Sequence, residues 1–328
     1  MPKIKNSTVL ICFSVCLLVS LFLDSRLTKI NKEIKMESIA KYNLKGVKDA
    51  EEALEKCGCL WTAEQDNMIT LGGTNIESHK ALVRSDNKQI LGVVGKGYTP
   101  FQPSYSFAHF QNMLNEHSIK WSQGVVIDKG SKIILKAEFP KKVLIRVGDE
   151  CVKQLVLINS FNMTTSFTVY LDMERLVCTN GMRSSSKANQ ISFKHTPNGQ
   201  FKADDSLKVF SKSVKYFEEF TEQCKYLAQV IADKQMVNSF LSEMFDTKVT
   251  TKDNKVSTRT KNQKKEVVEL FKRGAGNNGS TAWDLYNGVT EWVDHNRTSN
   301  EDKRMVSALI GSGSDIKKKA FNTLLQMV

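Results

Sequence analysis

Hydrophobic and polar positions follow a strand-like pattern through the middle of the chain. Residues 119–180 contain short apolar or alternating segments, and turns at 129–130 and 148–150 each join two segments into a predicted hairpin. Another strand is predicted over 164–171, where hydroxyl-bearing and apolar residues alternate. Because consecutive hairpins are typical of antiparallel pairing, the pattern predicts an antiparallel sheet.

The second half of the chain has the three- and four-residue spacing of amphipathic helices. A long helix is predicted over 205–232, and Ser280 or Thr281 can cap another helix that begins at Ala282. The remaining predicted elements are a strand over 89–95 and helices over 46–57, 104–114, 236–245, 264–272 and 315–328. The predicted fold class is α+β, an antiparallel sheet of consecutive hairpins followed by a helical C-terminal half.

Composition and periodicity divide the chain into four parts. Residues 1–35 are an apolar N-terminal segment, and residues 36–203 are the β-rich half of the main domain. Residues 204–300 are the helical half of the same domain, with a mobile basic loop predicted at 247–263, where periodicity is lost. Residues 301–328 form the C-terminal helix.

The N-terminal segment contains an apolar run whose length is marginal for a membrane span. Residues 8–23 carry no charge and follow Lys3 and Lys5, whereas a spanning helix needs about 20 apolar residues. No small-residue cleavage site follows the run. The alternatives are an uncleaved anchor, a mis-called start with Met36 as the true first residue, and a cleaved signal. The expected location is cytoplasmic, or membrane-anchored if residues 8–23 are translated and retained.

The cysteines and glycine motifs do not indicate a metal or a cofactor. The seven cysteines are mostly scattered among apolar neighbours, where free cysteine packs as a small hydrophobic residue. Cys57 and Cys59 form a close pair, but a zinc site needs four ligands in paired clusters. Gly95 and Gly97 do not continue into a dinucleotide-binding motif, because Pro100 stands where the third glycine belongs. We therefore predict neither a metal site nor a cofactor.

Positive charge is concentrated in a few segments of the chain. The 328 residues have a net charge of +12, with 41% hydrophobic and 25% charged residues, which excludes collagen-like, fully disordered and polytopic membrane classes. Segment 248–273 contains nine Lys and Arg and three acidic residues. Segment 120–146 contains seven Lys and Arg and two acidic residues, and segment 175–215 contains eight and two. Such segments attract polyanions by counterion release. The alternative is a solvated surface without a partner.

The strongest candidate site is a basic stretch after a predicted strand end at Cys178. Asn180 and Gly181 have turn chemistry, because Asn tolerates and Gly prefers positive φ. Backbone N–H groups of such a turn, together with nearby cations, can hold phosphate or another anion. The candidate nucleic-acid-binding or anion-binding residues are Arg175, Asn180, Gly181, Arg183, Lys187, Lys194 and His195. The alternative is a structural turn above a buried Cys178.

Five motifs occur in order along the body of the chain. They are YTPFQ at 98–102, INSFN at 158–162, RLVCTNGM at 175–182, ISFKHT at 191–196 and TAWDLYNGVTEWVDH at 281–295. In their order and spacing they resemble the phage/plasmid-like protein family, a domain-of-unknown-function family of phages, plasmids and bacteria. The similarity covers about residues 60–297. Phe161 departs from it, because relatives often have a histidine there.

The resemblance implies no firmly assigned activity, but its setting in mobile elements implies work on nucleic acid or in host defence. A sheet of hairpins followed by helices is also similar to single-strand annealing proteins of phage recombination, which is an argument from fold analogy. The first hypothesis is therefore a nucleic-acid-binding accessory of mobile elements, including single-strand annealing. Trp121, Tyr170 and Phe193 are candidate stacking residues.

Two other classes of function stay open. A structural or host-inhibitory module would bind another protein through the helix at 205–232. An enzyme of unknown class would use Asn180, His195 and a carboxylate, although no residue is nominated as catalytic. The expected partner is single-stranded nucleic acid, and a homo-oligomer is also open.

Overall fold

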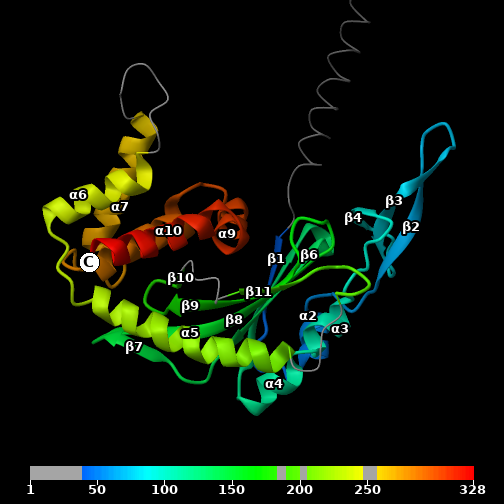
Figure 1. Ribbon diagram of the computed structural model, residues 1–328, viewed down its shortest axis with the longest axis horizontal. Helices are drawn as coiled ribbons and strands as arrows, with labels where there is room; N and C mark the ends of the chain where they lie inside the picture. Colours follow the sequence, from blue (N-terminus) through cyan, green and yellow to red (C-terminus); the bar gives the residue numbers. More distant parts are fainter. Residues whose placement is uncertain (1–38, 183–189, 200–204, 247–256) are drawn as a thin grey trace, which may run out of the picture. The chain divides into compact units, whose positions relative to one another are not determined.

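The computed structural model describes residues 39–182, 190–199, 205–246 and 257–328. The chain divides into two units, Met1–Ser38 and Ile39–Val328, and every described residue belongs to the second. Antiparallel strands come first and helices follow, which confirms the predicted α+β class (Figure 1). No helix within the described ranges combines the length and apolar character needed to cross a bilayer. The apolar run at 8–23 lies outside these ranges.

An antiparallel sheet forms the centre of this unit. Within the described residues it has eight strands in the order β1-β5-β6-β8-β9-β10, with β7 on β8 and β11 on β9. Their bounds are β1 Ile39–Asn43, β5 Lys120–Ile127, β6 Lys132–Glu138, β7 Val143–Arg146, β8 Asp149–Ser160, β9 Phe167–Arg175, β10 Asn180–Met182 and β11 Gln190–Phe193. Both predicted hairpins are confirmed, since β5 pairs with β6 and β7 pairs with β8.

A smaller sheet is formed by the part of the chain between β1 and β5. Its strands are β2 (Ala63–Ile69), β3 (Asn75–Arg84) and β4 (Ile90–Gly95). The strand predicted over 89–95 is β4, whereas β1, β2 and β3 were not expected from the pattern. β2 alternates poorly, because its burial pattern leaves five of seven residues exposed. Figure 1 shows the β2–β3 hairpin extending away from the central sheet.

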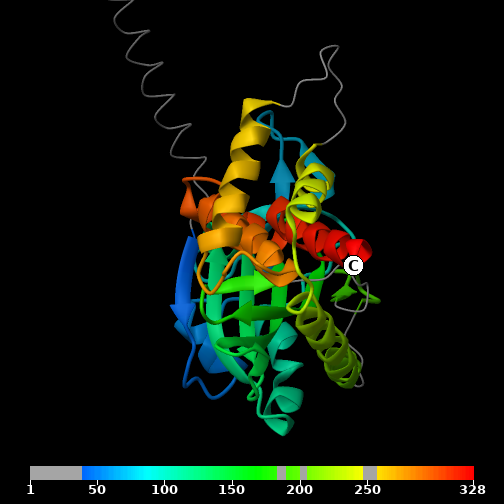
Figure 2. The same cartoon turned by 90° about the vertical axis from the view of Figure 1, so that its left-hand side faces the viewer.

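Helices cover both faces of the central sheet (Figures 1 and 2). On one face, α5 (Asp205–Leu227) lies near β8, and Lys153 Nζ stands 5.6 Å above the ring of Phe217. On the other face, Leu309 of α9 (Glu301–Ile310) packs with a cluster that includes Val156. The face of α5 that carries Phe217, Phe220 and Cys224 is buried inside the protein. The remaining helices are α2 Ala50–Lys56, α3 Pro103–Ala108, α4 Gln111–Glu116, α6 Lys234–Phe245, α7 Thr258–Arg273, α8 Ala282–Glu291 and α10 Ser312–Met327, with the π-helical turn η3 Trp292–Asn296 after α8.

Several helix boundaries differ from the prediction. The helix predicted over 104–114 is divided into α3 and α4, and the C-terminal helix predicted over 301–328 is divided into α9 and α10. The long helix ends at Leu227 rather than near 232. Helix α7 begins at Thr258, inside the loop predicted at 247–263, because the Ser257 side chain caps it by accepting a hydrogen bond from Thr260 N at 3.1 Å. The first buried residue of α7 is Val267, so its first two turns carry no apolar stripe. The rest of the predicted loop, 247–256, lies outside the described residues.

Candidate functional site

The turn after β9 lies earlier in the chain than the sequence predicts. The turn occupies residues 176–179, and Thr179 is its residue with positive φ, at 54°. Asn180 and Gly181 are in strand β10, paired with Arg175 and Glu174. The predicted Asn-Gly turn is therefore wrong. Strand pairing and burial of the Asn180 side chain outweigh the local turn preference of this dipeptide.

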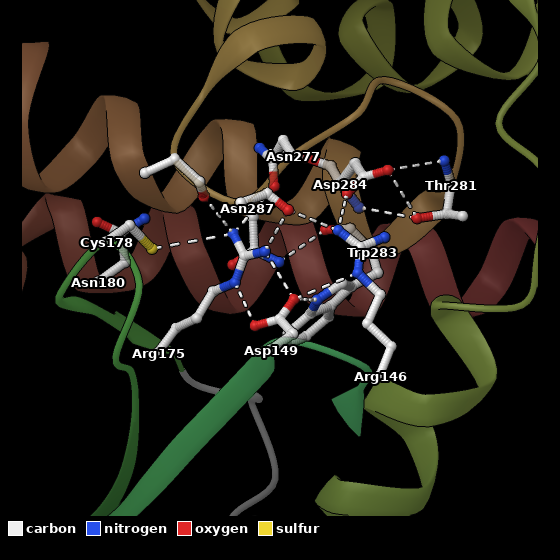
Figure 3. Close-up of polar contacts among 12 residues, drawn as sticks. Arg146, Asp149, Arg175, Cys178, Asn180, Asn277, Thr281, Trp283, Asp284 and Asn287 are labelled. Carbon is white, nitrogen blue, oxygen red and sulfur yellow. Dashed lines mark hydrogen bonds and ion pairs between the residues drawn. The ribbon is translucent and has the colours of Figure 1, made fainter. Parts of the chain in front are cut away.

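Arg175 is fully buried, and its guanidinium is held by groups inside the protein (Figure 3). Its Nε and Nη2 atoms each donate to Asp149, one to each carboxylate oxygen, at 2.6 Å. Other donations go to the backbone oxygens of Ala275 and Gly276 and to Asn277 Oδ1, each at 2.9 Å, and a longer one goes to Cys178 Sγ at 3.9 Å. Arg175 therefore joins the sheet to the loop before α8. It does not reach an external anion in this conformation.

Asn180 and Gly181 both contact η3 rather than an open anion cradle. The buried Asn180 side chain lies 2.9 Å from His295 Nε2, with the amide orientation set by that contact and by Cys178 O. The Gly181 N–H donates to Asp294 Oδ2 at 3.1 Å. A backbone N–H that already serves a carboxylate is not free to bind phosphate. The two motifs 175–182 and 281–295 thus meet at this point.

The remaining candidates do not join that cluster. Lys194 is exposed, and His195 is buried beside Tyr98 and Phe101, with ring centroids 5.0 and 4.8 Å away. Arg183 and Lys187 lie outside the described residues. The described candidates thus occupy three separate environments, and an anion-binding role for the group stays a prediction.

His195 connects the segment that follows β11 to the segment 98–101. Its Nδ1 accepts a hydrogen bond from Phe101 N at 3.2 Å, and its backbone oxygen accepts one from Thr99 N at 3.1 Å. Its Nε2 is buried and makes no hydrogen bond to the described residues. Burial lowers the pKa of His195 from 6.5 to about 4. A neutral imidazole that accepts from a backbone N–H supports the fold, which is a structural role.

The residues of the TAWD motif lock α8 onto the sheet. Thr281 and Asp284 form a capping box at the start of α8, and Asp284 Oδ1 also accepts a hydrogen bond from Arg146 Nη2 at 2.5 Å. Trp283 Nε1 donates to Asp149 Oδ2 at 2.8 Å (Figure 3). Burial acts to raise the pKa of Asp284, but the hydrogen bond and charge of Arg146 lower it overall. These motif residues therefore have an architectural role that the sequence alone did not show.

The aromatic residues proposed for base stacking are mostly inside the core. Trp121 and Tyr170 are buried, with Trp121 Nε1 donating to Gln111 and the Tyr170 hydroxyl donating to Leu309 O. Phe193 is half-buried. Phe161, the departure from the family pattern, is buried with its ring centroid 5.2 Å from that of Trp61. Trp121 and Tyr170 therefore cannot stack on a base in this conformation.

A cavity of about 380 Å³ lies between α9 and the face of the central sheet that α9 covers. Gln123, Asp172 and Glu174 line it from the sheet, and Met305, Ala308 and Leu309 line it from α9. Gly181, Asp294, His295 and Lys317 complete it near η3 and α10. Two segments that carry the family motifs therefore contribute polar groups to one cavity.

The lysines around this cavity are each paired with a carboxylate. Lys317 is buried, with its Nζ 2.5 Å from Asp294 Oδ1. Lys41 pairs with Glu301 at 2.6 Å, and Lys136 lies 3.8 Å from Glu174. Burial raises the pKa of Glu174, while the charge of Lys136 opposes that shift. Sequence reasoning missed Lys317, although a signal existed: it stands in the apolar stripe of α10 with Ala320, Phe321 and Leu324.

Helix α7 carries an exposed lysine face. Lys261, Lys265 and Lys272 are exposed and stand at positions i, i+4 and i+11, so they lie on one side of the helix. Within the described ranges none of the three makes an ion pair, whereas Lys264 pairs with Asp246 at 2.7 Å. Glu266 Oε2 accepts a hydrogen bond from Trp292 Nε1 at 2.8 Å. Glu269 is the acidic residue nearest to this lysine face along α7.

The cysteines do not form a metal site or an activated nucleophile among the described residues. Burial raises the pKa of Cys57 and of Cys178 to about 11 and that of Cys59 to about 12. A thiol with so high a pKa is protonated at neutral pH and is a poor nucleophile and metal ligand. The described ranges contain no cluster of three His, Cys, Asp or Glu residues suited to a metal ion.

The comparison with protein families gives a match. The family described as Domain of unknown function (DUF932) matches residues 90–310, which include the central sheet from β5 onward, the motif residues around Asn180 and helix α8. The chain belongs to this domain family of unknown function. No curated protein and no solved structure matches this chain.

Proposed function

We propose that this protein is a nucleic-acid-binding accessory that holds single strands through the exposed lysine face of α7. The observation that carries the proposal is the row of Lys261, Lys265 and Lys272 without carboxylate partners in the described structure. A phosphate backbone that meets unpaired lysines releases condensed counterions, which favours binding. A lysine already in an ion pair would have to break that pair first.

The proposal moves the predicted binding surface away from the turn near Asn180. Arg175 is buried against Asp149, so it cannot supply the charge first expected from it. The α7 lysines lie in the segment 248–273, which is also the segment with nine Lys and Arg against three acidic residues. Contacts of lysine with phosphate carry no sequence information, and we therefore expect binding that is independent of sequence.

The resemblance to phage/plasmid-like proteins supports a role on nucleic acid in mobile elements. A surface that holds a strand without reading its sequence would also suit the annealing of complementary strands. We therefore include single-strand annealing in the proposal. Annealing is measured separately from binding, by the rate at which two complementary labelled strands form a duplex.

Charge reversal on α7 tests the proposed surface. The variant K261E/K265E/K272E is compared with K48E/K96E/K212E, which changes the net charge equally at exposed lysines on other elements. Fluorescence anisotropy of full-length protein with a labelled single strand and with a duplex gives the affinities. We expect the α7 variant to lose at least tenfold in single-strand affinity and the control variant to lose much less. Equal losses in both variants, or tighter binding of the duplex, would contradict the proposal.

A further inference from the structure

The cavity beneath α9 has the size and the two-sided lining of a site for a planar ligand. Its volume of about 380 Å³ lies within the range of about 300–1,000 Å³ that is usual for small-molecule sites. Met305, Ala308 and Leu309 give it an apolar wall, and Gln123 gives it an amide on the opposite side. A flat heterocycle with apolar faces and polar edges matches such a lining.

Hydrogen-bonding groups of the lining remain available to a ligand. The Gln123 side chain makes no hydrogen bond within the described structure, although an amide offers both donors and an acceptor. The Glu174 carboxylate, which accepts a hydrogen bond from Gln154 Nε2 at 3.2 Å, is a further acceptor in the lining. Gln123 thus offers both a donor and an acceptor to the edge of a base, and Glu174 adds a second acceptor.

The charge balance favours an uncharged ligand over a phosphate. The three lysines of the lining each have a carboxylate partner, since Lys41, Lys136 and Lys317 pair with Glu301, Glu174 and Asp294. Arg304 donates to the backbone oxygens of Asp294 and Thr298. A phosphate would have to displace a carboxylate from one of the lysines or a backbone oxygen from Arg304, whereas a neutral base would not.

Gly181 keeps the sheet side of the cavity open. A Cβ atom at this position would stand 3.1 Å from Asp172 Oδ2 and 3.5 Å from Lys317 Nζ. Gly181 and Asp294 are joined by a hydrogen bond across the two family motifs. The arrangement therefore fixes the polar rim of the cavity and leaves its interior free of side chains at this point.

We propose that this cavity binds one unstacked nucleobase, with Gln123 at its edge and Met305 against its face. The inference rests on the proposed function in that the bound single strand is the source of the base. Enzymes that read an extruded base use the same combination of apolar contact with its face and hydrogen bonds to its edge. Here the base would be held, and no chemical step is implied.

Two variants of the full-length protein test the cavity. Met305→Trp fills it from α9, and Gln123→Leu removes the amide with little change of volume. Their matched controls are Met163→Trp and Gln229→Leu, at exposed positions outside the cavity. Thermal unfolding of all four establishes that the folded state is retained. The probe is 2-aminopurine riboside, whose fluorescence anisotropy rises when it binds, with unlabelled adenosine and cytidine as competitors.

We expect the wild type, both controls and K261E/K265E/K272E to bind the free riboside. Met305→Trp should abolish binding, and Gln123→Leu should weaken it about tenfold, the size of effect expected for one good edge contact. The base site is overturned if the wild type does not bind the riboside, or if Met305→Trp and Gln123→Leu bind it with wild-type affinity. If the wild type binds the riboside but K261E/K265E/K272E keeps the wild-type affinity for single strands, the cavity is supported and the α7 surface is refuted. Failure of the cavity and failure of the α7 surface are therefore distinguishable.

Discussion

At the scale of single residues, the Arg175–Asp149 pair shows how a cation can serve the fold instead of a ligand. Both side chains are almost completely excluded from solvent, and Trp283 Nε1 donates to the same carboxylate. Gly276, with φ at +72°, allows the loop to approach, because a Cβ there would stand 2.8 Å from Arg175 Nη2. The local sequence around Arg175 could not reveal this role, since Asp149 is 26 residues away on the paired strand.

Breaking this pair should be strongly destabilising. Arg175→Met removes both guanidinium hydrogen bonds from the buried Asp149 carboxylate and leaves it Arg146 Nε, at 3.4 Å, as its remaining cation contact. We expect a loss of about 3–5 kcal/mol in the free energy of unfolding. The double variant R175M/D149N removes both charges and should be more stable than R175M alone. Urea unfolding measures both variants. Lys142→Met, which breaks an exposed pair with Glu150, is the control and should change stability by less than about 1 kcal/mol.

His195 makes stability depend on pH below neutrality. Its folded-state pKa of about 4 lies below the ordinary 6.5, so the unfolded chain binds more protons between these values. The contribution of His195 to the free energy of unfolding is therefore complete above pH 6.5 and decreases as the pH falls toward 4. We expect the wild type to lose about 2 kcal/mol more than His195→Gln between pH 7.5 and pH 5.

Urea unfolding at the two pH values gives this difference. His79→Gln, at an exposed histidine, should follow the wild type. Parallel pH curves for the wild type and His195→Gln would show that the buried imidazole is not the group responsible.

At the scale of elements, periodicity predicted the elements that have a clear apolar stripe and failed for those that have none at their start or along their length. The hairpins around β6 and β8 and the buried face of α5 follow from the order of their side chains. The start of α7 does not, because Ser257 caps it before any apolar residue appears. Strand β1 was missed because it is five residues long and only partly buried.

The two motif segments also show what can be read at this scale. Thr281 was expected as one of two possible caps, and the structure places it at the cap with Asp284 three residues later. Gly288 of the same motif permits close packing of α7 on α8, since a Cβ would stand 2.9 Å from Phe271 N. The contact of Asn180 with His295 joins residues 115 positions apart, and no local pattern predicts it.

The capping box of α8 should have a graded effect on stability. Thr281→Ala removes one cap bond, and we expect a loss of about 1 kcal/mol in the free energy of unfolding. Asp284→Ala should cost more, because it also leaves the partly buried Arg146 without its closest carboxylate. Urea unfolding of the two variants gives the order. Equal losses would show that the contact of Arg146 with Asp284 contributes little.

At the scale of the whole molecule, the two candidate surfaces have separate chemistries. The lysine face of α7 is exposed and unpaired among the described residues, whereas the lysines that line the cavity beneath α9 are each paired with a carboxylate. The total charge and the basic segment 248–273 were readable from the sequence. The cavity was not, because β5, β9, η3, α9 and α10 all contribute to it, and only the folded chain brings them together.

The salt dependence of single-strand binding tests the central claim most directly. Each lysine that neutralises a phosphate contributes about 0.7 to the slope of log affinity against log salt concentration for single strands. We therefore expect K261Q/K265Q/K272Q to reduce the magnitude of the wild-type slope by about 2, and K48Q/K96Q/K212Q to leave it unchanged. A wild-type slope near zero, or the same slope in both triple variants, would contradict the account.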